Sequence, residues 1–429
     1  MGLSQHDAAV VGAGPVGCVA AIALARAGKR VVLLEAAPVG RRLAGEWLHP
    51  AAVDLLRELG VPLPPSASRD AARGFIVFPE DGSAPVELPY PCGRFGLTCE
   101  HHVLVAWLRR AAAALPNLEV RSDVQVTQVV DQCVNYRERG AAEPRKLSAP
   151  LIVGADGRGS VTRRSLGLPD GREAVSMMAS VRIVGVRLPH EGYGHVCLGG
   201  PGPVVITRIA PDAVRFCLDV PPNVEGEFRW PETLVRLYEP AVPESVRVAF
   251  REALRTETVE WAANQRRPRD AFGRPGLALV GDAAGHCHPL TATGMTTGFL
   301  DADKLAKSRG FEEYRRHRLA RSLGPELLAE GLYRLFSRAD PASLALRQSV
   351  YATWRRNASE CTRTMRLLSG DDAGLLSFGR SFFTAVGGAV ASRRRGARAA
   401  LVGPGVAAWA GWLGRSVAPR VVARGVSIL

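Results

Sequence analysis

The first 35 residues combine two hydrophobic patterns. An apolar run at 8–11 ends in glycines, an alanine-rich segment with helical spacing extends to Gly28, and a second apolar run covers Val31 to Leu34. Short apolar runs bounded by glycine are typical of buried parallel strands, and a longer segment between them is typical of a crossover helix. This order predicts a strand-helix-strand unit.

The rest of the chain switches between strand and helix patterns. The segments 73–90 and 178–220 alternate apolar and polar residues between Pro and Gly breaks, which is typical of antiparallel strands. The pattern therefore predicts an α/β chain that contains a separate antiparallel sheet. The remaining expected elements are helices over 50–60, 102–114 and 295–308, and strands over 118–130, over 151–154 and from 276.

The turn after the first strand carries a phosphate-binding pattern of glycines. Glycines in the spacing G-x-G-x-x-G allow a tight turn and bring a pyrophosphate close to a helix N-terminus, which carries about half a positive charge. An acid at the tip of the second strand accepts a hydrogen bond from a ribose hydroxyl and favours a ribose without a 2′-phosphate. The unit predicts FAD or NAD, with contacts from Gly12, Gly14, Pro15, Val16, Gly17, Glu35 and Ala36.

Two later strands end in turns of a similar type. One apolar strand runs into Asp156-Gly157 and another runs into Gly281-Asp282. Because ligands of open α/β sheets bind at the carboxyl ends of strands, one long cofactor held at several strand ends explains the repetition. FAD is long enough for this arrangement, whereas NAD alone rarely engages so distant a part of a chain. The turns therefore favour FAD.

His286, Cys287 and His288 follow Asp282 closely and raise the question of a metal site. Adjacent residues usually point apart, and the chain has no second pair of ligands at metal spacing. A metal site is therefore disfavoured, and Asp282 is better explained as a cofactor contact. The threonines and glycine that follow open the helix from Met295, whose first amides would stabilise a reduced flavin by about 0.3–2 kcal/mol.

Taken together, these motifs resemble the single-chain flavin-dependent monooxygenases of the aromatic-hydroxylase fold (class A), and within that group the squalene monooxygenase family. The resemblance covers roughly residues 8–390. Its most specific pieces follow the family's order: R-L-A-G-E-W-L-H-P at 42–50, L-P-Y-P at 88–91, H-P-L-T-A-T-G-M-T at 288–296, L-Y-R-L-F-S at 332–337, L-L-S-G at 367–370 and F-F-T-A-V at 382–386.

The resemblance implies a Rossmann-like FAD-binding domain of the glutathione-reductase type, an inserted antiparallel-sheet substrate domain and a C-terminal helical region. The expected divisions are 1–170, with strands near 73–90 joining the substrate sheet, then 171–271 for the substrate domain, 272–310 for the return of the FAD-binding domain and 311–429 for the helices. The further cofactor contacts that it implies, with Asp282 on the ribityl chain of FAD, are Arg42, Glu46, Asp156, Gly157, Gly281, Asp282, Pro289, Gly294 and Met295. From the residues alone, Arg42 and Glu46 are equally well read as surface charges.

This chain departs from the family at three places near the expected flavin. Phe75 stands where the family has a tyrosine and is a candidate pocket residue, Val103 stands where the family has an arginine, and Ala292-Thr293 replaces a Gly-Gly pair. These differences leave the flavoprotein prediction intact. They make an isoprenoid-tailed or polyene secondary metabolite at least as good a substrate as squalene.

In such an enzyme the chemistry belongs to a flavin C4a-hydroperoxide, so the protein positions the substrate and excludes water. We assign no catalytic residue, and the lack of an identifiable base favours an alkene over a phenol. The expected reaction is epoxidation or hydroxylation of a hydrophobic isoprenoid-like or polyene molecule with molecular oxygen. An aromatic or quinone hydroxylase, an isoprenoid double-bond reductase and a non-enzymatic surface-binding module are the alternatives. NAD(P)H would supply electrons directly or through a separate flavin or NADPH reductase.

The distribution of charge adds information only at the C-terminus. The formal net charge is +14, and no acid follows Asp372. Apolar stretches shorter than a membrane-spanning helix alternate there with arginines, which suits either an interfacial segment on anionic lipid or a helical pair packed on the core. We expect a cytoplasmic protein, peripheral on the inner membrane in the first case, without a nucleic-acid partner. The arginines are Arg380, Arg393, Arg394, Arg395, Arg398, Arg415, Arg420 and Arg424.

Overall fold

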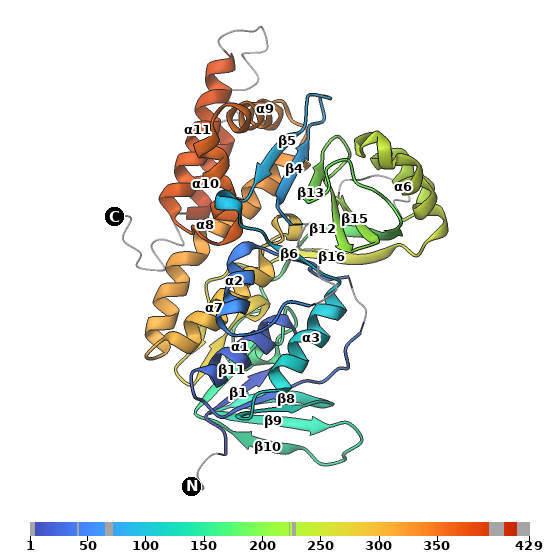
Figure 1. The fold of residues 1–429 in the computed structure, drawn as a ribbon. Helices are drawn as coiled ribbons and strands as arrows, with labels where there is room; N and C mark the ends of the chain where they lie inside the picture. The colour runs from blue at the N-terminus through green and yellow to red at the C-terminus, as the bar shows by residue number, and fades with distance from the viewer. Residues whose placement is uncertain are drawn as a thin grey trace.

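The computed structural model describes residues 5–40, 43–64, 72–222, 224, 229–393 and 407–417. A parallel sheet lies in the lower half of Figure 1, an antiparallel sheet lies above it, and a group of C-terminal helices lies at the upper left. Arg42 and much of the arginine-rich tail lie outside the described residues.

The parallel sheet is the predicted nucleotide-binding sheet. Its strands run in the order β17-β18-β11-β1-β2-β7, and all neighbours pair in parallel except β17 with β18. The predicted strand-helix-strand unit is therefore confirmed as β1-α1-β2. The strands are β1 (Ala8–Val11), β2 (Val31–Leu34), β7 (Leu118–Arg121), β11 (Leu151–Gly154), β17 (Gly273–Arg274) and β18 (Leu277–Leu279).

The two faces of this sheet are covered differently. Ala8 and Val10 pack into a core with helices, whereas Ala9 and Val11, which alternate with them, pack against a small three-stranded sheet. Because both faces are covered, the strands are apolar throughout rather than alternating. The helical layer contains α1 (Pro15–Arg26), α2 (Pro50–Glu58), α3 (His101–Ala113) and α7 (Gly294–Lys307); the small sheet contains β8 (Val124–Val130), β9 (Cys133–Glu138) and β10 (Arg145–Ser148), with α4 (Val161–Ser165) beside it.

The segment 118–130 differs from its prediction as one strand. It divides into β7 and β8, which belong to two different sheets. Asp123, between them, has a φ of 59°. A left-handed residue cannot continue an extended strand, so the chain turns there. An apolar pattern alone did not reveal this break.

The antiparallel sheet has seven strands in the order β16-β12-β15-β14-β13-β4-β5. The early hairpin at 73–90 joins this sheet, as the sequence predicts, through a parallel pairing of β4 with β13. Helices α5 (Pro231–Tyr238) and α6 (Glu244–Thr256) cover its outer face. The strands are β4 (Gly74–Phe78), β5 (Val86–Pro89), β12 (Glu173–Val184), β13 (Tyr193–Cys197), β14 (Val204–Ala210), β15 (Ala213–Val220) and β16 (Glu260–Arg266).

Helices α8 to α11 follow α7 and close the other face of β4 and β5, and a further helical segment at 407–417 packs on them through Trp409 and Trp412. They form one apolar core with Trp47, Phe75, Val77 and Leu88. Among the described helices, none combines the length and hydropathy needed to cross a membrane. The helices are α8 (Phe311–Ser337), α9 (Pro341–Arg356), α10 (Ala358–Ser369) and α11 (Leu375–Arg393), and β3 (Trp47–Leu48) pairs with β6 (Leu97–Thr98) below them.

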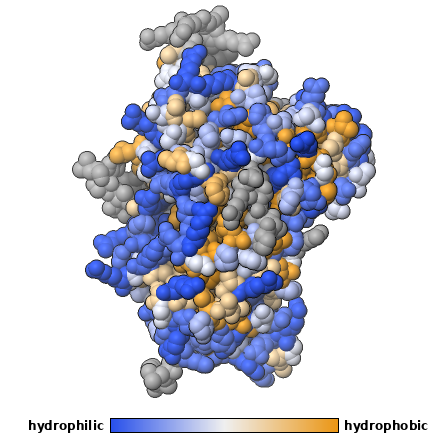
Figure 2. Space-filling model, viewed as in Figure 1, coloured by the Kyte–Doolittle hydropathy of each residue, from blue (hydrophilic) through white to orange (hydrophobic). Residues whose placement is uncertain are grey.

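The surface distinguishes the junction of the two large sheets from the ends of the molecule. On the face in Figure 2, apolar residues gather near the middle, and hydrophilic residues cover both ends. Strands β12 to β16 lie within 171–271, and β17 and β18 belong to the parallel sheet.

Candidate functional site

The glycine turn after β1 is built for close packing on one side and for open space on the other. Gly12 has a φ of 96°, and a Cβ there would lie 2.8 Å from the backbone oxygen of Ala155. A Cβ on Gly17 would lie 1.8 Å from the oxygen of Gly12. A Cβ on Gly14, in contrast, would have no atom within 4 Å. The turn therefore leaves room at Gly14, before the first turn of α1.

Glu35 lies at the end of β2 and faces this turn. Its Oε2 accepts from the amide of Ala13 at 2.6 Å, and its Oε1 accepts from the amide of Ala37 at 2.9 Å. Both bonds fix the carboxylate next to the glycine turn. This is the position at which a carboxylate can accept from the hydroxyls of a bound ribose.

Arg109 is a site residue that the sequence did not reveal. It extends from α3, its Nη2 lies 3.0 Å from Glu35 Oε2, and its Nε donates to the oxygen of Ala13 at 2.9 Å. Its neighbour Arg110 instead stacks on Trp107, with 5.9 Å between the guanidinium and the ring centre. Nothing in the spacing separates these two arginines, because only the packing of α3 decides which one reaches the turn.

The second strand-end turn lies directly beside the first. A Cβ on Gly12 would lie 3.0 Å from the Cα of Asp156, so the two turns are in contact. The carboxylate of Asp156 accepts from the Ser160 hydroxyl at 2.5 Å and from the Thr162 amide at 3.0 Å. Asp156 therefore shapes the loop into α4, and Gly157 has a φ of 73° within that loop.

The third strand-end turn meets the start of α7. Asp282 is partly exposed, and a Cβ on Gly294 would lie 4.0 Å from its Oδ1. A Cβ on Gly281 would contact Val16 at 3.0 Å, so this turn packs against the start of α1. Arg158 Nε lies 3.5 Å from Asp282 Oδ2. This carboxylate and the first amides of α7 thus face the same space.

The loop between β2 and β3 is held by the antiparallel sheet. Both carboxylate oxygens of Glu46 accept from Arg215 of β15, at 2.7 and 2.9 Å, and Arg215 also bonds Glu260 at 2.7 Å. A Cβ on Gly45 would lie 3.1 Å from Met295 Cε. Glu46 is thus engaged through its side chain, and the loop it anchors lies against the start of α7.

These residues fit an elongated flavin nucleotide. Glu35, the glycine turn and the positive N-terminus of α1 form one end, and Asp282 with the N-terminus of α7 forms the other. The strand ends of β1, β2, β11 and β18 bring them to one edge of the sheet. The open side of Gly14 matches the need for a phosphate to approach the backbone. Sequence motifs separated by more than 240 residues therefore converge on one edge of the parallel sheet, which we call the cofactor cleft.

The short turn Pro289–Thr291 lies between this cleft and the antiparallel sheet. On one side, the Nε2 of His49 donates to the oxygen of Thr291 at 2.9 Å, and its Nδ1 accepts from the Tyr90 hydroxyl at 2.6 Å. Burial lowers the pKa of His49 to about 4, so the ring is neutral. The indole of Trp47 donates to Tyr90 at 3.0 Å and completes the chain of bonds.

On the other side, His288 fixes the same turn. Its Nδ1 accepts from the Leu290 amide at 3.3 Å, which places the ring proton on Nε2, and Nε2 donates to Asp219 at 3.1 Å. The ring stacks on Tyr333 with 3.7 Å between centres. His288 is therefore part of a hydrogen-bonded network. Across the described residues, no group of three or more potential metal ligands is present.

An apolar pocket lies beside the turn. Phe75 stacks on Trp47 in its wall, with ring centres 4.6 Å apart. Its two polar side chains are already satisfied, because Thr291 bonds Thr293 at 3.1 Å and Thr364 accepts from Trp354 at 3.1 Å. The free volume is about 30 Å³, so a ligand enters only if side chains move. The lining residues are Phe75, Val77, Leu88, Val196, Leu290, Thr291, Leu332, Phe336, Trp354, Thr364 and Leu368.

Comparison with known proteins agrees with this geometry. The family model described as FAD binding domain matches residues 5–308. Squalene epoxidase 2, mitochondrial, of Arabidopsis thaliana is 30% identical over 414 residues, which are 89% of this chain and 69% of that protein. The chain belongs to the squalene monooxygenase branch of the FAD-dependent monooxygenases. FAD is accordingly the cofactor of the cleft, and NAD(P)H is the usual reductant in this class.

Other relatives carry the same family name. Squalene epoxidase erg1 of Aspergillus fumigatus is 31% identical over 331 residues, which are 70% of this chain and 66% of that protein. Squalene monooxygenase of Rattus norvegicus is 26% identical over 404 residues, which are 86% of this chain and 68% of that protein. The aligned region thus spans about two thirds of the length of these three relatives.

Solved structures share the fold at lower identity. The flavin-dependent brominase Bmp2 superimposes with a TM-score of 0.73 at 17% identity, covering 91% of this chain and 100% of that chain. The p-nitrophenol 4-monooxygenase PnpA of Pseudomonas putida gives 0.69 at 19% identity, covering 87% and 98%. These likenesses establish the fold alone.

Proposed function

We propose that this enzyme transfers one oxygen atom from O2 to a double bond or adjacent carbon of a hydrophobic isoprenoid-like or polyene molecule, in secondary metabolism. The observation that carries the proposal is the apolar pocket beside the turn Pro289–Thr291. The names of the relatives, squalene epoxidase and squalene monooxygenase, point to the same class of substrate.

The pocket favours an alkene over a phenol. A phenol hydroxylase benefits from a base that ionises its substrate, and such a residue is expected on the strands over 178–220. Among the described lining residues, these strands contribute only Val196, and no charged side chain is present. An apolar chain loses no hydrogen bonds on entering such a pocket, whereas a phenol hydroxyl would be left unpaired.

The protein's own part in the reaction is positioning and exclusion of water. Bound FAD supplies the oxygen chemistry, with electrons from NAD(P)H directly or through a reductase. His49 and His288 hold the turn from opposite sides, so the pocket wall formed by Leu290 and Thr291 has a fixed position relative to the cleft. Aromatic and aliphatic side chains then orient the double bond and keep water away.

The cofactor contacts are proposed on the same geometry. Arg109 is added to them because it bonds both Glu35 and the glycine turn. Glu46 acts on the cofactor loop as a positioning residue through Arg215. The proposed contacts among the described residues are Gly12, Gly14, Pro15, Val16, Gly17, Glu35, Ala36, Arg109, Asp156, Gly157, Gly281, Asp282, Pro289, Gly294 and Met295.

A peripheral membrane position is also part of the proposal. Leu376 and Phe383 on α11 are 71% and 62% exposed, and Val390 is exposed on the same side at the next interval of seven residues. A seven-residue interval places side chains on one face of a helix. An exposed apolar face next to arginines suits the surface of an anionic membrane, where a hydrophobic substrate would be available.

A substrate panel tests the proposal. The FAD-loaded enzyme is incubated with a reducing system, O2 and either linear isoprenoid alkenes or substituted phenols of similar size, and products are identified by mass spectrometry. We expect mono-oxygenated alkenes and no phenol product. Hydroxylation of phenols alone, or saturation of the alkene without oxygen consumption, would contradict the proposal.

A further inference from the structure

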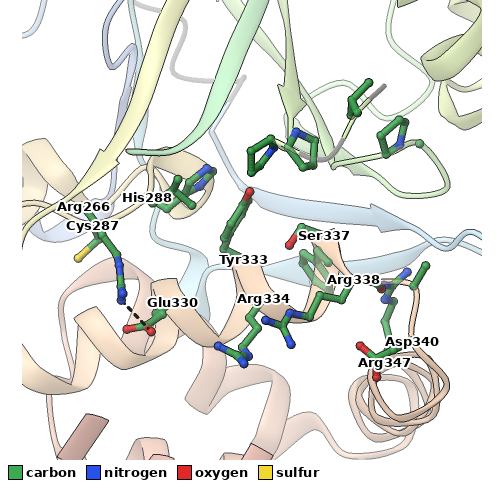
Figure 3. A pocket seen from close by; sticks show the side chains of 18 of the residues that line it. Arg266, Cys287, His288, Glu330, Tyr333, Arg334, Ser337, Arg338, Asp340 and Arg347 are labelled. Atoms are coloured by element: carbon green, nitrogen blue, oxygen red, sulfur yellow. Dashed lines mark hydrogen bonds and ion pairs between the residues drawn. The ribbon is translucent and has the colours of Figure 1, made fainter. Parts of the chain in front are cut away.

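A second, much larger cavity lies on the other side of α8. Its volume is about 1510 Å³, and it extends between the last turns of α8, the start of α9, the first residues of β12 and the residues that follow β15. Tyr333, Arg334, Ser337 and Arg338 line it from the end of α8, and in Figure 3 Tyr333 points up toward the strands whereas Arg334 points down. We call it the cationic cavity. Its volume exceeds the roughly 300–1,000 Å³ of typical small-molecule sites.

The acids in its wall have different partners. Glu326 accepts from the Arg269 amide at 3.2 Å, Asp340 accepts from the Ser343 amide at 3.0 Å, and Glu80, Glu173 and Glu330 pair with arginines. Arg266 bonds Glu173 at 2.7 Å and Glu330 at 2.9 Å, and the second of these pairs is drawn in Figure 3. Arg347 bonds Glu80 at 2.9 Å. Because these ion pairs are neutral, the net charge of the wall depends on its other arginines.

Three arginines of the wall form no direct ion pair within the described part of the chain, although the charge of Asp340 acts on Arg338 and that of Glu330 acts on Arg334. They are Arg236 of α5, Arg334 of α8 and Arg338 at the C-terminal end of α8. Arg334 instead stacks over the rings of Trp409 and Trp412, at 5.7 and 6.0 Å. A guanidinium stays charged in any protein environment, so the cavity carries positive charge that Asp340 and Glu330 offset only in part.

The arrangement of these cations is unfavourable without an anion. Arg334 lies in the last turn of α8 and Arg338 directly follows the helix, close enough for their like charges to repel. Burial is the largest cause that lowers the pKa of Arg334; the charges of Arg338, Arg415 and Arg266 lower it further, and that of Glu330 raises it. The negative end of the α8 dipole offsets part of the repulsion. A carboxylate or phosphate would offset the rest through charge-assisted hydrogen bonds.

The cationic cavity adjoins the apolar pocket. Phe336 lines both of them, on the stretch of α8 that separates the two spaces. The turn near the cofactor cleft also borders both, with His288 on the cationic side and Leu290 on the apolar side. A molecule could therefore reach past Phe336 with one end in each space.

We propose that the cationic cavity binds the anionic end group, a carboxylate or a phosphate, of an amphiphilic isoprenoid-like substrate whose double bond reaches the apolar pocket. This inference rests on the proposed function and narrows its substrate class. Arg236, Arg334 and Arg338 are then specificity-determining residues, because they select the charged end of the molecule without contacting the reacting carbon.

Matched substrates test the assignment. The FAD-loaded wild type and the double variant Arg236→Gln/Arg338→Gln, whose sites are both exposed, are assayed with a prenyl carboxylate or phosphate and with its neutral methyl ester or alcohol. Two lost charge-assisted contacts predict a KM increase of roughly tenfold or more for the anion and a smaller change for the neutral molecule. Arg356→Gln, an exposed arginine outside the cavity, is the control and should change neither value.

A binding experiment tests the anion site independently of the proposed oxygenation reaction. Calorimetry with dodecyl phosphate, dodecanoate and dodecanol, none of which has a double bond, measures the end-group preference even if no substrate is oxygenated. Tighter binding of the anions, lost in the double variant, supports the cavity as the anion site. Equal affinities for all three in the wild type would overturn it. A tenfold rise in KM for NADPH alone would assign the arginines to the nucleotide and would also overturn it.

Discussion

The cofactor cleft and the apolar pocket are adjacent, yet they are built in different ways. The cleft consists largely of backbone atoms at strand ends and helix starts, with Glu35 and Asp282 as its acids. The pocket consists of side chains from β4, β5, β13, the turn Pro289–Thr291 and helices α8 to α10. The cleft therefore depends on residues for which there is no substitute, whereas the pocket can change its substrate through ordinary apolar substitutions.

The largest effect is expected at the glycines of the cleft. A side chain in Gly17→Val would have to occupy space 1.8 Å from the oxygen of Gly12, so we expect loss of folded, flavin-binding protein. Gly14→Ala is the matched control, because its Cβ meets no protein atom. It should keep the thermal stability of the cofactor-free protein and weaken FAD binding, measured by flavin fluorescence. Equal behaviour of the two variants would contradict the account of the turn.

A charged side chain in the apolar pocket should lower turnover of the substrate but leave the affinity for FAD unchanged. In Leu332→Asp the carboxylate would have no partner in the apolar wall, and an unpaired buried charge costs several kcal/mol. We expect kcat/KM for an alkene to fall by about 100-fold, with an unchanged dissociation constant for FAD. Leu332→Met keeps the volume and should stay within about threefold of the wild type. Loss of FAD in the aspartate variant would show that the two regions are not separable.

Substitution of Arg109 tests the cofactor cleft without altering the apolar pocket. Arg109→Gln removes the cation that orients Glu35, so the dissociation constant for FAD should rise by about tenfold, corresponding to one charged hydrogen bond. The neighbouring variant Arg110→Gln removes only a surface stacking contact and should leave FAD binding unchanged. Equal effects of both variants would mean that α3 acts through its overall charge.

Much of the cleft could be predicted from sequence because its signals are local. Gly12, Gly14 and Gly17 with Glu35 form a spacing that has one structural meaning, and the hairpin at 73–90 had the alternation of the sheet that it joins. Arg109 could not be predicted, because its helix carries two adjacent arginines and only packing distinguishes them. The pairing of Glu46 with Arg215 spans 169 residues and has no local signal.

The pocket was predicted only in outline. Phe75 was a candidate through its position in the family motif. The contributions of Leu332, Phe336 and Trp354 depend on how α8 and α9 pack against β4, and a buried helix face looks the same in sequence whether it meets a core or a ligand. The break at Asp123 was missed for a similar reason, since one left-handed residue leaves the apolar pattern intact.

Three buried histidines predict a pH dependence of stability. Burial lowers the pKa of His49, His195 and His286 to about 4. Below about pH 6.5 the unfolded chain binds a proton on each of these histidines, whereas the folded chain does not until the pH nears 4. The stabilising contribution of the neutral rings is therefore complete above about pH 6.5. Each histidine lowers the free energy of unfolding by about 1.4 kcal/mol for every pH unit below that value, down to about pH 4. His49→Gln should reduce the slope of the unfolding free energy against pH by one proton, measured by urea denaturation. An unchanged slope would contradict a neutral His49.

The smallest effect is expected in the turn itself. Ala292 has a φ of 52°, which costs a residue with a Cβ about 1 kcal/mol. Ala292→Gly should therefore raise the free energy of unfolding, by less than about 1 kcal/mol because glycine also gains entropy in the unfolded chain. Ala106→Gly, on the exposed face of α3, should lower it by about 1 kcal/mol. A loss of stability in both variants would contradict the strained turn.

In the proposed function, the apolar pocket directs oxygen from the bound flavin nucleotide to a carbon-carbon double bond. The most direct measurement is a reaction of the FAD-loaded enzyme with a linear isoprenoid under ¹⁸O2, followed by mass spectrometry of the product. We predict one ¹⁸O atom per product molecule, at a former double bond or its neighbouring carbon. A product without ¹⁸O, or oxygen consumed only to hydrogen peroxide while phenols are hydroxylated, would contradict the account.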